Sequence, residues 1–181
     1  MANNTHGYVS LMRGAATDVD SFNRVGIYTT GDLDNGVLVT LGDITKATDG
    51  TVTAFNYAVT PATADTTGSV WLVNTPEVGT NIEMQMMSDP RYFYNEKGRP
   101  MSLKYLNPKT DIIEADAGCF VNATLPTIAQ KYVTVGAGGK YVAAPAAAAD
   151  AGKPYFSVVG FNEVAVGMGV MKTVLLQCES N

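Results

Sequence analysis

The sequence predicts an all-β protein, a compact β-barrel or sandwich with short loops, little helix and a flexible N-terminal arm. The chain holds 20 valines and 20 threonines but only 10 leucines and 6 glutamates, and β-branched side chains fit a pleated sheet better than a helix. Short apolar runs also recur between clusters of Gly, Pro, Asn and Asp, a pattern typical of sandwiches and barrels. At 181 residues the chain has the length of about one domain. We therefore expect an arm over residues 1–23 and a single β domain over residues 24–181.

The predicted strands are the apolar runs that lie between turn signals. In chain order they cover residues 24–30, 36–41, 51–59, 70–74, 82–87, 111–115, 118–123, 131–135, 155–161, 163–167 and 169–179. Alternation within 51–59 places Phe55, Tyr57 and Val59 on one face, which indicates a strand with one buried side.

Turn chemistry separates these runs. Asp34-Asn35-Gly36 and Asp49-Gly50 supply residues that tolerate positive φ, so each predicts a hairpin. The glycine-rich segment 136–140 predicts a further hairpin tip. Within the alanine-rich tract 143–154, the helix-like residues 146–151 lie between Pro145 and Pro154, which leaves room for at most one or two helical turns.

Residues 1–23 differ from the rest of the chain. Their apolar residues, Tyr8, Val9, Leu11 and Met12, show no sustained period of either kind. One interpretation is an arm that becomes ordered only on a neighbouring subunit, with Arg13 as an anchor. The alternative is a frayed terminus followed by a first edge strand.

Charge narrows the choice of partners. The chain carries 12 basic and 17 acidic side chains, a net charge of −5, and no basic cluster. This balance argues against nucleic acid and against an anionic membrane as partners. Charged residues make up only 16% of the chain, so either a partner covers part of the surface or the protein has an uncharged β surface.

The residues available for chemistry are few. Cys119 and Cys178 lie far apart in apolar contexts, which favours two buried small side chains over a disulfide. His6 is the single histidine, and this disfavours zinc sites and nucleophiles activated by histidine. The Gly-Lys of 139–140 lacks the flanking residues of a phosphate loop, and Asp32 to Gly36 lacks the spacing of a calcium loop. We therefore predict no enzymatic activity, no cofactor and no metal.

An aromatic cluster, Tyr92-Phe93-Tyr94, follows Arg91 and precedes Tyr105 in the sequence. Such a cluster forms either a platform for a sugar or peptide, or a small core beneath a loop. Its exposure, together with that of the single tryptophan Trp71, distinguishes the two interpretations.

Several segments resemble small structural proteins of tailed bacteriophages. Residues 32–42 match a D-x-x-N-G-x-L-V-x-L-G hairpin, and residues 70–78 match a V-W-L-V-x-x-P-E-V strand. Residues 89–100 are similar to a D-P-R-x-F-x-N-x-x-G-R-P loop, and residues 155–160 and 170–179 are similar to closing strands. Some proteins of this family are decoration, or cement, proteins of the phage head.

The resemblance implies a non-enzymatic virion protein that decorates and stabilises a capsid by binding the major capsid protein. It implies a protein made in the host bacterial cytoplasm and placed on the outer capsid surface, as a homo-oligomer with a trimer favoured. The alternative is a head-fibre or tail base component with a carbohydrate-binding β face. The predicted capsid or subunit interface consists of Tyr8, Val9, Leu11, Met12, Arg13, Arg91, Tyr92, Phe93 and Tyr94.

Overall fold

The computed structural model describes residues 6–15, 22–52, 54–79, 82, 90–146, 152–166 and 169–181. The protein is all-β: 47% of it is strand and 9% is helical, and no described helix reaches seven residues. The strands are β1 (Val9–Ala15), β2 (Asn23–Ile27), β3 (Leu38–Ile44), β4 (Asn56–Pro61), β5 (Trp71–Val73), β6 (Pro100–Tyr105), β7 (Ile112–Asp116), β8 (Tyr132–Val135), β9 (Tyr141–Ala144), β10 (Tyr155–Val166) and β11 (Gly169–Ser180). Short 3-10 turns are η2 (Pro90–Tyr92), η3 (Ala117–Cys119), η4 (Val121–Ala123) and η5 (Ala137–Gly139). The predicted fold class is thus confirmed.

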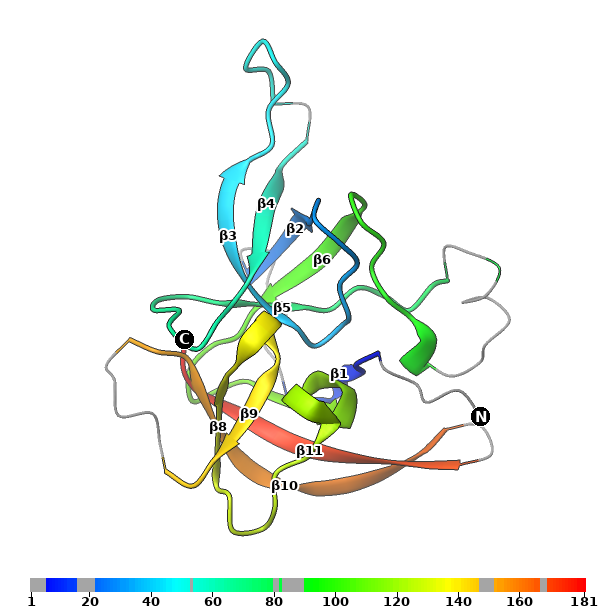
Figure 1. The fold of residues 1–181 in the computed structure, drawn as a ribbon, viewed down its shortest axis with the longest axis vertical. Coiled ribbons are helices and arrows are strands. Elements are labelled where there is room, and N and C mark those ends of the chain that lie inside the picture. Colours follow the sequence, from blue (N-terminus) through cyan, green and yellow to red (C-terminus); the bar gives the residue numbers. More distant parts are fainter. Residues whose placement is uncertain are drawn as a thin grey trace.

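Five strands close a small barrel in the order β2-β4-β3-β5-β6 (Figure 1). Strand β2 pairs in parallel with β4, whereas the other neighbours in the barrel are antiparallel. The interior is filled by Leu33, Val37, Val39, Val59, Val73, Met101 and Leu103. Gly26 is required in β2, since a Cβ there would lie 2.6 Å from Leu103 and 2.7 Å from Val59.

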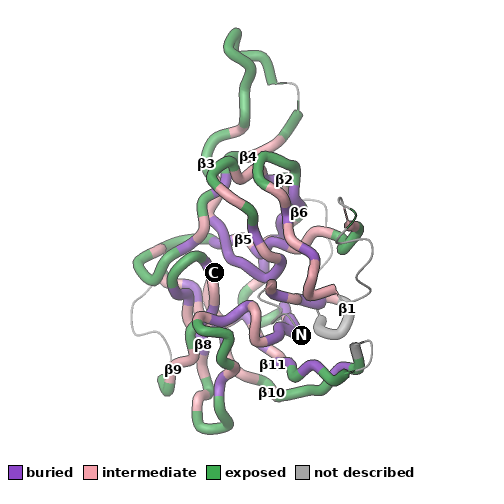
Figure 2. Tube along the Cα trace, turned by 45° about the vertical axis from the view of Figure 1, so that its right-hand side comes forward, coloured by how far each residue is buried: buried purple, intermediate pink, exposed green. Residues whose placement is uncertain are grey.

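Six antiparallel strands form the second sheet, in the order β1-β7-β11-β10-β8-β9. Its centre is the long hairpin of β10 and β11, which borders the lower margin of the molecule in Figure 1. Figure 2 shows buried residues recurring along β11 and mostly exposed residues along the second half of β10.

The barrel and the six-stranded sheet share one hydrophobic core. Leu38 and Leu72 of the barrel strands pack in the same cluster as Phe156 and Val174 of the sheet. The tip of the β8–β9 hairpin joins the two parts, because the N–H of Gly139 donates to the carbonyl of Ala62 at 2.7 Å.

Several predicted elements differ from the observed ones. Residues 118–123 form η3 and η4 rather than a strand. The two strands predicted over 155–161 and 163–167 are a single strand, β10, which ends at Val166, and residue 167 lies outside the described residues. The turn at Gly36 joins β2 to β3, which do not pair, so the hairpin predicted there is wrong. The hairpin predicted at Asp49-Gly50 is confirmed between β3 and β4. The segments 83–87 and 147–151 lie outside the described residues.

The prediction of an N-terminal arm is wrong for residues 9–15. These residues form β1, an edge strand that pairs with β7 through Val9 opposite Ala115 and Ser10 opposite Glu114. Val9 is 2% exposed and belongs to the shared core. The alternative of a first edge strand therefore describes this segment, while residues 1–5 and 16–21 lie outside the described residues.

Candidate functional site

The residues predicted to form an interface serve largely to pack the chain against itself. Phe93 is buried, and Tyr8 packs against Val164 and Met171. The ring of Tyr94 stacks on His6, with centroids 5.0 Å apart. The structure thus brings the N-terminal segment and the 91–94 loop together.

The remaining predicted interface residues divide into two groups. Leu11 packs on the shared core, while Arg91 and Tyr92 are half-buried within η2. The side chains of Met12 and Arg13 lie outside the described part of the chain. The buried positions Val9 and Phe93 cannot contact a partner in this fold, so the interface prediction is wrong for these two.

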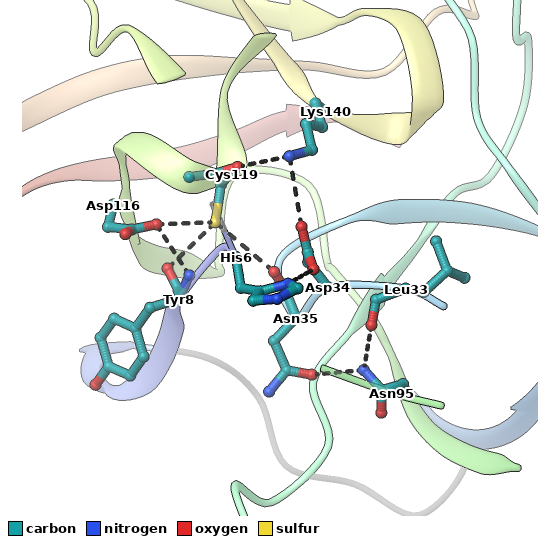
Figure 3. A network of polar contacts seen from close by, with 10 residues as sticks. His6, Tyr8, Leu33, Asp34, Asn35, Asn95, Asp116, Cys119 and Lys140 are labelled. Carbon is teal, nitrogen blue, oxygen red and sulfur yellow. Dashed lines mark hydrogen bonds and ion pairs between the residues drawn. The ribbon is translucent and has the colours of Figure 1, made fainter. Parts of the chain in front are cut away.

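A network of polar contacts joins the N-terminal segment to three distant parts of the chain (Figure 3). His6 Nδ1 lies 2.6 Å from Asp34 Oδ1 in the loop before β3. Lys140, at the β8–β9 tip, places its Nζ 3.4 Å from Asp34 Oδ2 and donates to the carbonyl of Gly118 at 3.0 Å. Asp34 therefore connects His6 and Lys140 across the junction of barrel and sheet.

Two buried asparagines hold the turn next to this network. The Nδ2 of Asn35 donates to the carbonyl of Thr75 at 2.8 Å, and its Oδ1 accepts from the N–H of Thr75 at 3.1 Å. The Nδ2 of Asn95 donates to the carbonyl of Leu33 at 3.0 Å and lies 3.2 Å from the Oδ1 of Asn35. Since both amides have partners inside the protein, their role is to fix the loop geometry.

The thiol of Cys119 lies between Asp116, Tyr8 and Asn35 in Figure 3. Its Sγ is 3.2 Å from the carbonyl oxygen of Tyr8 and 3.6 Å from Asp116 Oδ1. Burial raises the pKa of the Cys119 thiol well above its usual range, and the neighbouring carboxylate of Asp116 raises it further. A nucleophilic cysteine requires a depressed pKa and access to substrate, so this site keeps the thiol protonated and acts as a structural contact.

A second polar cluster lies between β7, β10 and β11. Glu114 is fully buried, and its Oε1 accepts from Thr173 Oγ1 at 2.6 Å and from Asn162 Nδ2 at 3.1 Å. Its Oε2 has no hydrogen-bond partner among the described residues. Thr173 and Asn162 also line a surface hollow between the loop 125–129 and the β10–β11 hairpin. The buried carboxylate of Glu114 therefore holds two residues of the wall of that hollow in place.

The candidate functional site is a groove between β10 and the loop 125–131 that precedes β8. A hollow of about 980 Å³ lies between residues 125–129 of the loop and residues 161–163 and 172–173 of the hairpin. A second hollow of about 480 Å³ lies where β8 meets β10, between residues 128–132 and 157–161. We call the two hollows together the loop–β10 groove.

Apolar side chains dominate the rim of the loop–β10 groove. Ile128 is 88% exposed and Phe161 46% exposed, and Val159 is also exposed. Glu163 and Lys172 occupy opposite positions on β10 and β11, so their charges balance. Clustered exposed apolar side chains mark binding surfaces for other proteins.

Sequence reasoning missed this groove. The signal that points to it is Ile128, an isolated large apolar residue in the otherwise polar or small-residue segment 127–131. Such a residue has no periodic partner within a strand or helix, and it therefore either fills a core or faces a partner. Its exposure supports the second alternative.

No protein-family model matches this chain, and no curated protein or solved structure matches it. Within the described residues there is no group of three or more His, Cys, Asp or Glu side chains placed to hold a metal ion. Asp32, a member of the calcium-like segment, accepts the N–H of Lys97 at 2.8 Å. In the same part of the chain, no helix has the length and hydropathy needed to cross a bilayer.

Proposed function

We propose that this chain is a non-enzymatic structural protein that decorates and stabilises a bacteriophage capsid by binding the major capsid protein. The observation that carries the proposal is the loop–β10 groove, which has a large exposed apolar side chain on each wall and in which the charges of Glu163 and Lys172 oppose one another. A protein with few charged residues and such a groove suits docking on a protein shell, where apolar contacts supply much of the affinity.

The placement of the phage-like segments is consistent with this proposal. Residues 32–42 and 70–78 contribute β3 and β5 to the barrel, whereas 155–160 and 170–179 lie in the β10–β11 hairpin. The resemblance therefore extends to both parts of the fold, including the strand that forms one wall of the groove.

A non-catalytic role agrees with the chemistry of the polar network. The thiol of Cys119 is buried, and the carboxylate of Asp34 contacts His6 Nδ1 and Lys140 Nζ. These groups bind one another rather than facing a cleft. Outer-surface placement on the capsid and assembly as a trimer, after synthesis in the host cytoplasm, belong to the same proposal.

The carbohydrate-binding alternative receives less support. It requires an exposed aromatic platform, whereas Phe93 is buried and Tyr94 stacks on His6. Trp71 packs against Tyr105 with their ring centroids 5.4 Å apart, and the guanidinium carbon of Arg24 lies 5.7 Å from the centroid of the Trp71 ring.

Binding to purified shells of the major capsid protein tests the proposal. Ile128→Asp and Phe161→Asp each place a charge in the groove at an exposed position. Loss of one buried apolar side chain weakens binding by about 1.5–3 kcal/mol, which corresponds to about 10–150-fold in Kd. Phe55→Asp is the matched control, because Phe55 is 77% exposed beside the far β3–β4 hairpin.

Co-sedimentation with the shells measures the affinity of each variant. We expect the control variant to bind like the wild type and the two groove variants to bind more weakly. Absence of wild-type binding would overturn the proposed function, and equal binding by all variants would place the contact surface elsewhere.

A further inference from the structure

A buried carboxylate lies directly behind the wall of the larger hollow in the loop–β10 groove. Glu114 is fully buried, and its Oε1 accepts from Asn162 Nδ2 at 3.1 Å and from Thr173 Oγ1 at 2.6 Å. Both donors line the hollow. The side chain of Glu114 therefore extends from β7 to the back of that wall.

The protein does not balance the charge of this carboxylate. None of the ion pairs formed among the described residues includes Glu114, and its Oε2 has no hydrogen-bond partner in the same part of the chain. A buried charge without a counter-charge is costly. A positive charge brought by a partner would supply the missing interaction.

The charged residues at the opening of the hollow do not supply it either. Lys172 and Glu163 are exposed and occupy opposite positions on β11 and β10, so they offset one another. With Glu114 behind the wall, the described residues around this hollow hold two carboxylates and one ammonium group. Such an excess of negative charge attracts cationic groups and disfavours anionic ones.

The rest of the hollow suits an apolar stem. Ile128 and Phe161 are exposed on its two walls, and its volume of about 980 Å³ is within the range of ligand sites. The exposed Asn162 uses its Oδ1 to accept the N–H of Glu163 at 2.9 Å and retains a second lone pair. Lysine and arginine side chains combine an apolar stem with a cationic head, so they match both parts of this hollow.

We propose that the larger hollow of the loop–β10 groove binds a basic side chain, a lysine or an arginine, of the major capsid protein, with the stem between Ile128 and Phe161 and the positive charge at Asn162, in front of Glu114. This inference rests on the proposed function, because it assigns the basic side chain to the capsid protein. An acidic side chain would face two carboxylates, and an apolar one would leave Glu114 without a counter-charge.

Small probes test the charge preference on the wild-type chain. n-Hexylammonium, n-hexanol and hexanoate share an apolar chain and differ in the charge of the head group. Titrations followed by NMR at the methyl groups of Ile128 and the ring of Phe161 measure the three dissociation constants. We expect n-hexylammonium to bind about tenfold more tightly than n-hexanol, and hexanoate to bind most weakly. Equal binding of the ammonium and the alcohol, tighter binding of hexanoate, or no binding of the ammonium would overturn the inference.

Glu114→Gln isolates the contribution of the buried carboxylate. The amide keeps an oxygen that can accept from Asn162 and Thr173, while the negative charge is lost. We expect n-hexylammonium to bind this variant about tenfold more weakly than the wild type, and n-hexanol to bind both equally. If the variant does not fold, the probe series on the wild type decides the inference.

Glu96→Gln is the matched control, because it removes one negative charge from the turn that precedes β6 of the barrel. Its affinities for the three probes should equal those of the wild type. An equal loss of n-hexylammonium binding in both variants would attribute the preference to net charge and overturn the site.

Binding to shells of the major capsid protein separates this inference from the proposed function. If the shells bind the wild type and n-hexylammonium shows no preference over n-hexanol, the basic side chain is overturned and the proposed function stands. If n-hexylammonium is preferred and the shells do not bind, the proposed function is overturned, and with it the assignment of the basic side chain to the capsid protein.

Discussion

The packing of β1 into the domain makes a quantitative prediction for Val9→Ala. Val9 is 2% exposed within the shared core, so the substitution removes two buried carbon atoms. At about 0.8 kcal/mol per buried CH₂, transfer accounts for about 1.6 kcal/mol, and the cavity left behind adds to this cost. We expect the free energy of unfolding to fall by about 2–3 kcal/mol, a large share of the ~5–15 kcal/mol typical of a domain.

Urea denaturation followed by tryptophan fluorescence and circular dichroism measures this loss. With an m-value of about 2 kcal/mol/M, the midpoint falls by about 1 M while m itself stays constant. The matched control is Val170→Ala, the same chemical change at a β11 residue that is 64% exposed, with an expected effect within about 0.5 kcal/mol. Equal effects of the two substitutions would show that residues 9–15 are an unpacked arm and would refute the packing of β1 into the core.

Three further predictions concern the junction and the buried groups. Gly139→Ala places a Cβ against the carbonyl oxygen of Leu38 at a residue with positive φ. It should lower the free energy of unfolding by at least about 1 kcal/mol more than Gly138→Ala, whose Cβ meets open space. Equal losses of stability in urea denaturation would contradict the close approach of Gly139 to Leu38. Burial raises the pKa of Asp116, so the carboxyl favours the folded state when protonated, and stability should fall as pH rises from about 4, the unfolded value, through the raised pKa. In the Asp116→Asn variant, the melting temperature should depend less on pH over this range than in the wild type. The same pH dependence in both proteins would show that Asp116 is not the cause. Burial raises the pKa of Cys178 to about 12 and that of Cys119 well above its usual range, so a thiol reagent at pH 8 should label neither cysteine until the protein unfolds.

The fold class was accessible from composition and local pattern. Valine and threonine disfavour helix through their restricted χ1 angles wherever they lie, and this preference does not depend on which strands pair. The turn at Asp49-Gly50 was equally accessible, because Gly50 has φ of +84° and the strands it joins are neighbours in the chain. Burial of Cys119 and Cys178 as free thiols also followed from their apolar contexts.

The pairing of strands that lie far apart in the sequence could not be predicted from composition and local pattern. The parallel pairing of β2 with β4 depends on the closure of the whole barrel. Residues 118–123 show the same limit on a smaller scale: Cys119 and Phe120 are buried as their composition predicts, yet they lie in and beside a 3-10 turn. Apolar composition predicts burial, but it does not by itself determine backbone conformation.

The N-terminal segment and the groove show the physical reason. The register of β1 against β7 is irregular between Ser10 and Ala15, so no alternation marks this strand in the sequence, and its partner lies about one hundred residues away. The loop–β10 groove likewise joins residues 125–131 to 157–163, which meet only when β8 pairs with β10. Local residue preferences act over a few positions and therefore determine strands and turns. Long-range strand pairing and shared burial determine which strand edges are paired and which apolar side chains remain exposed.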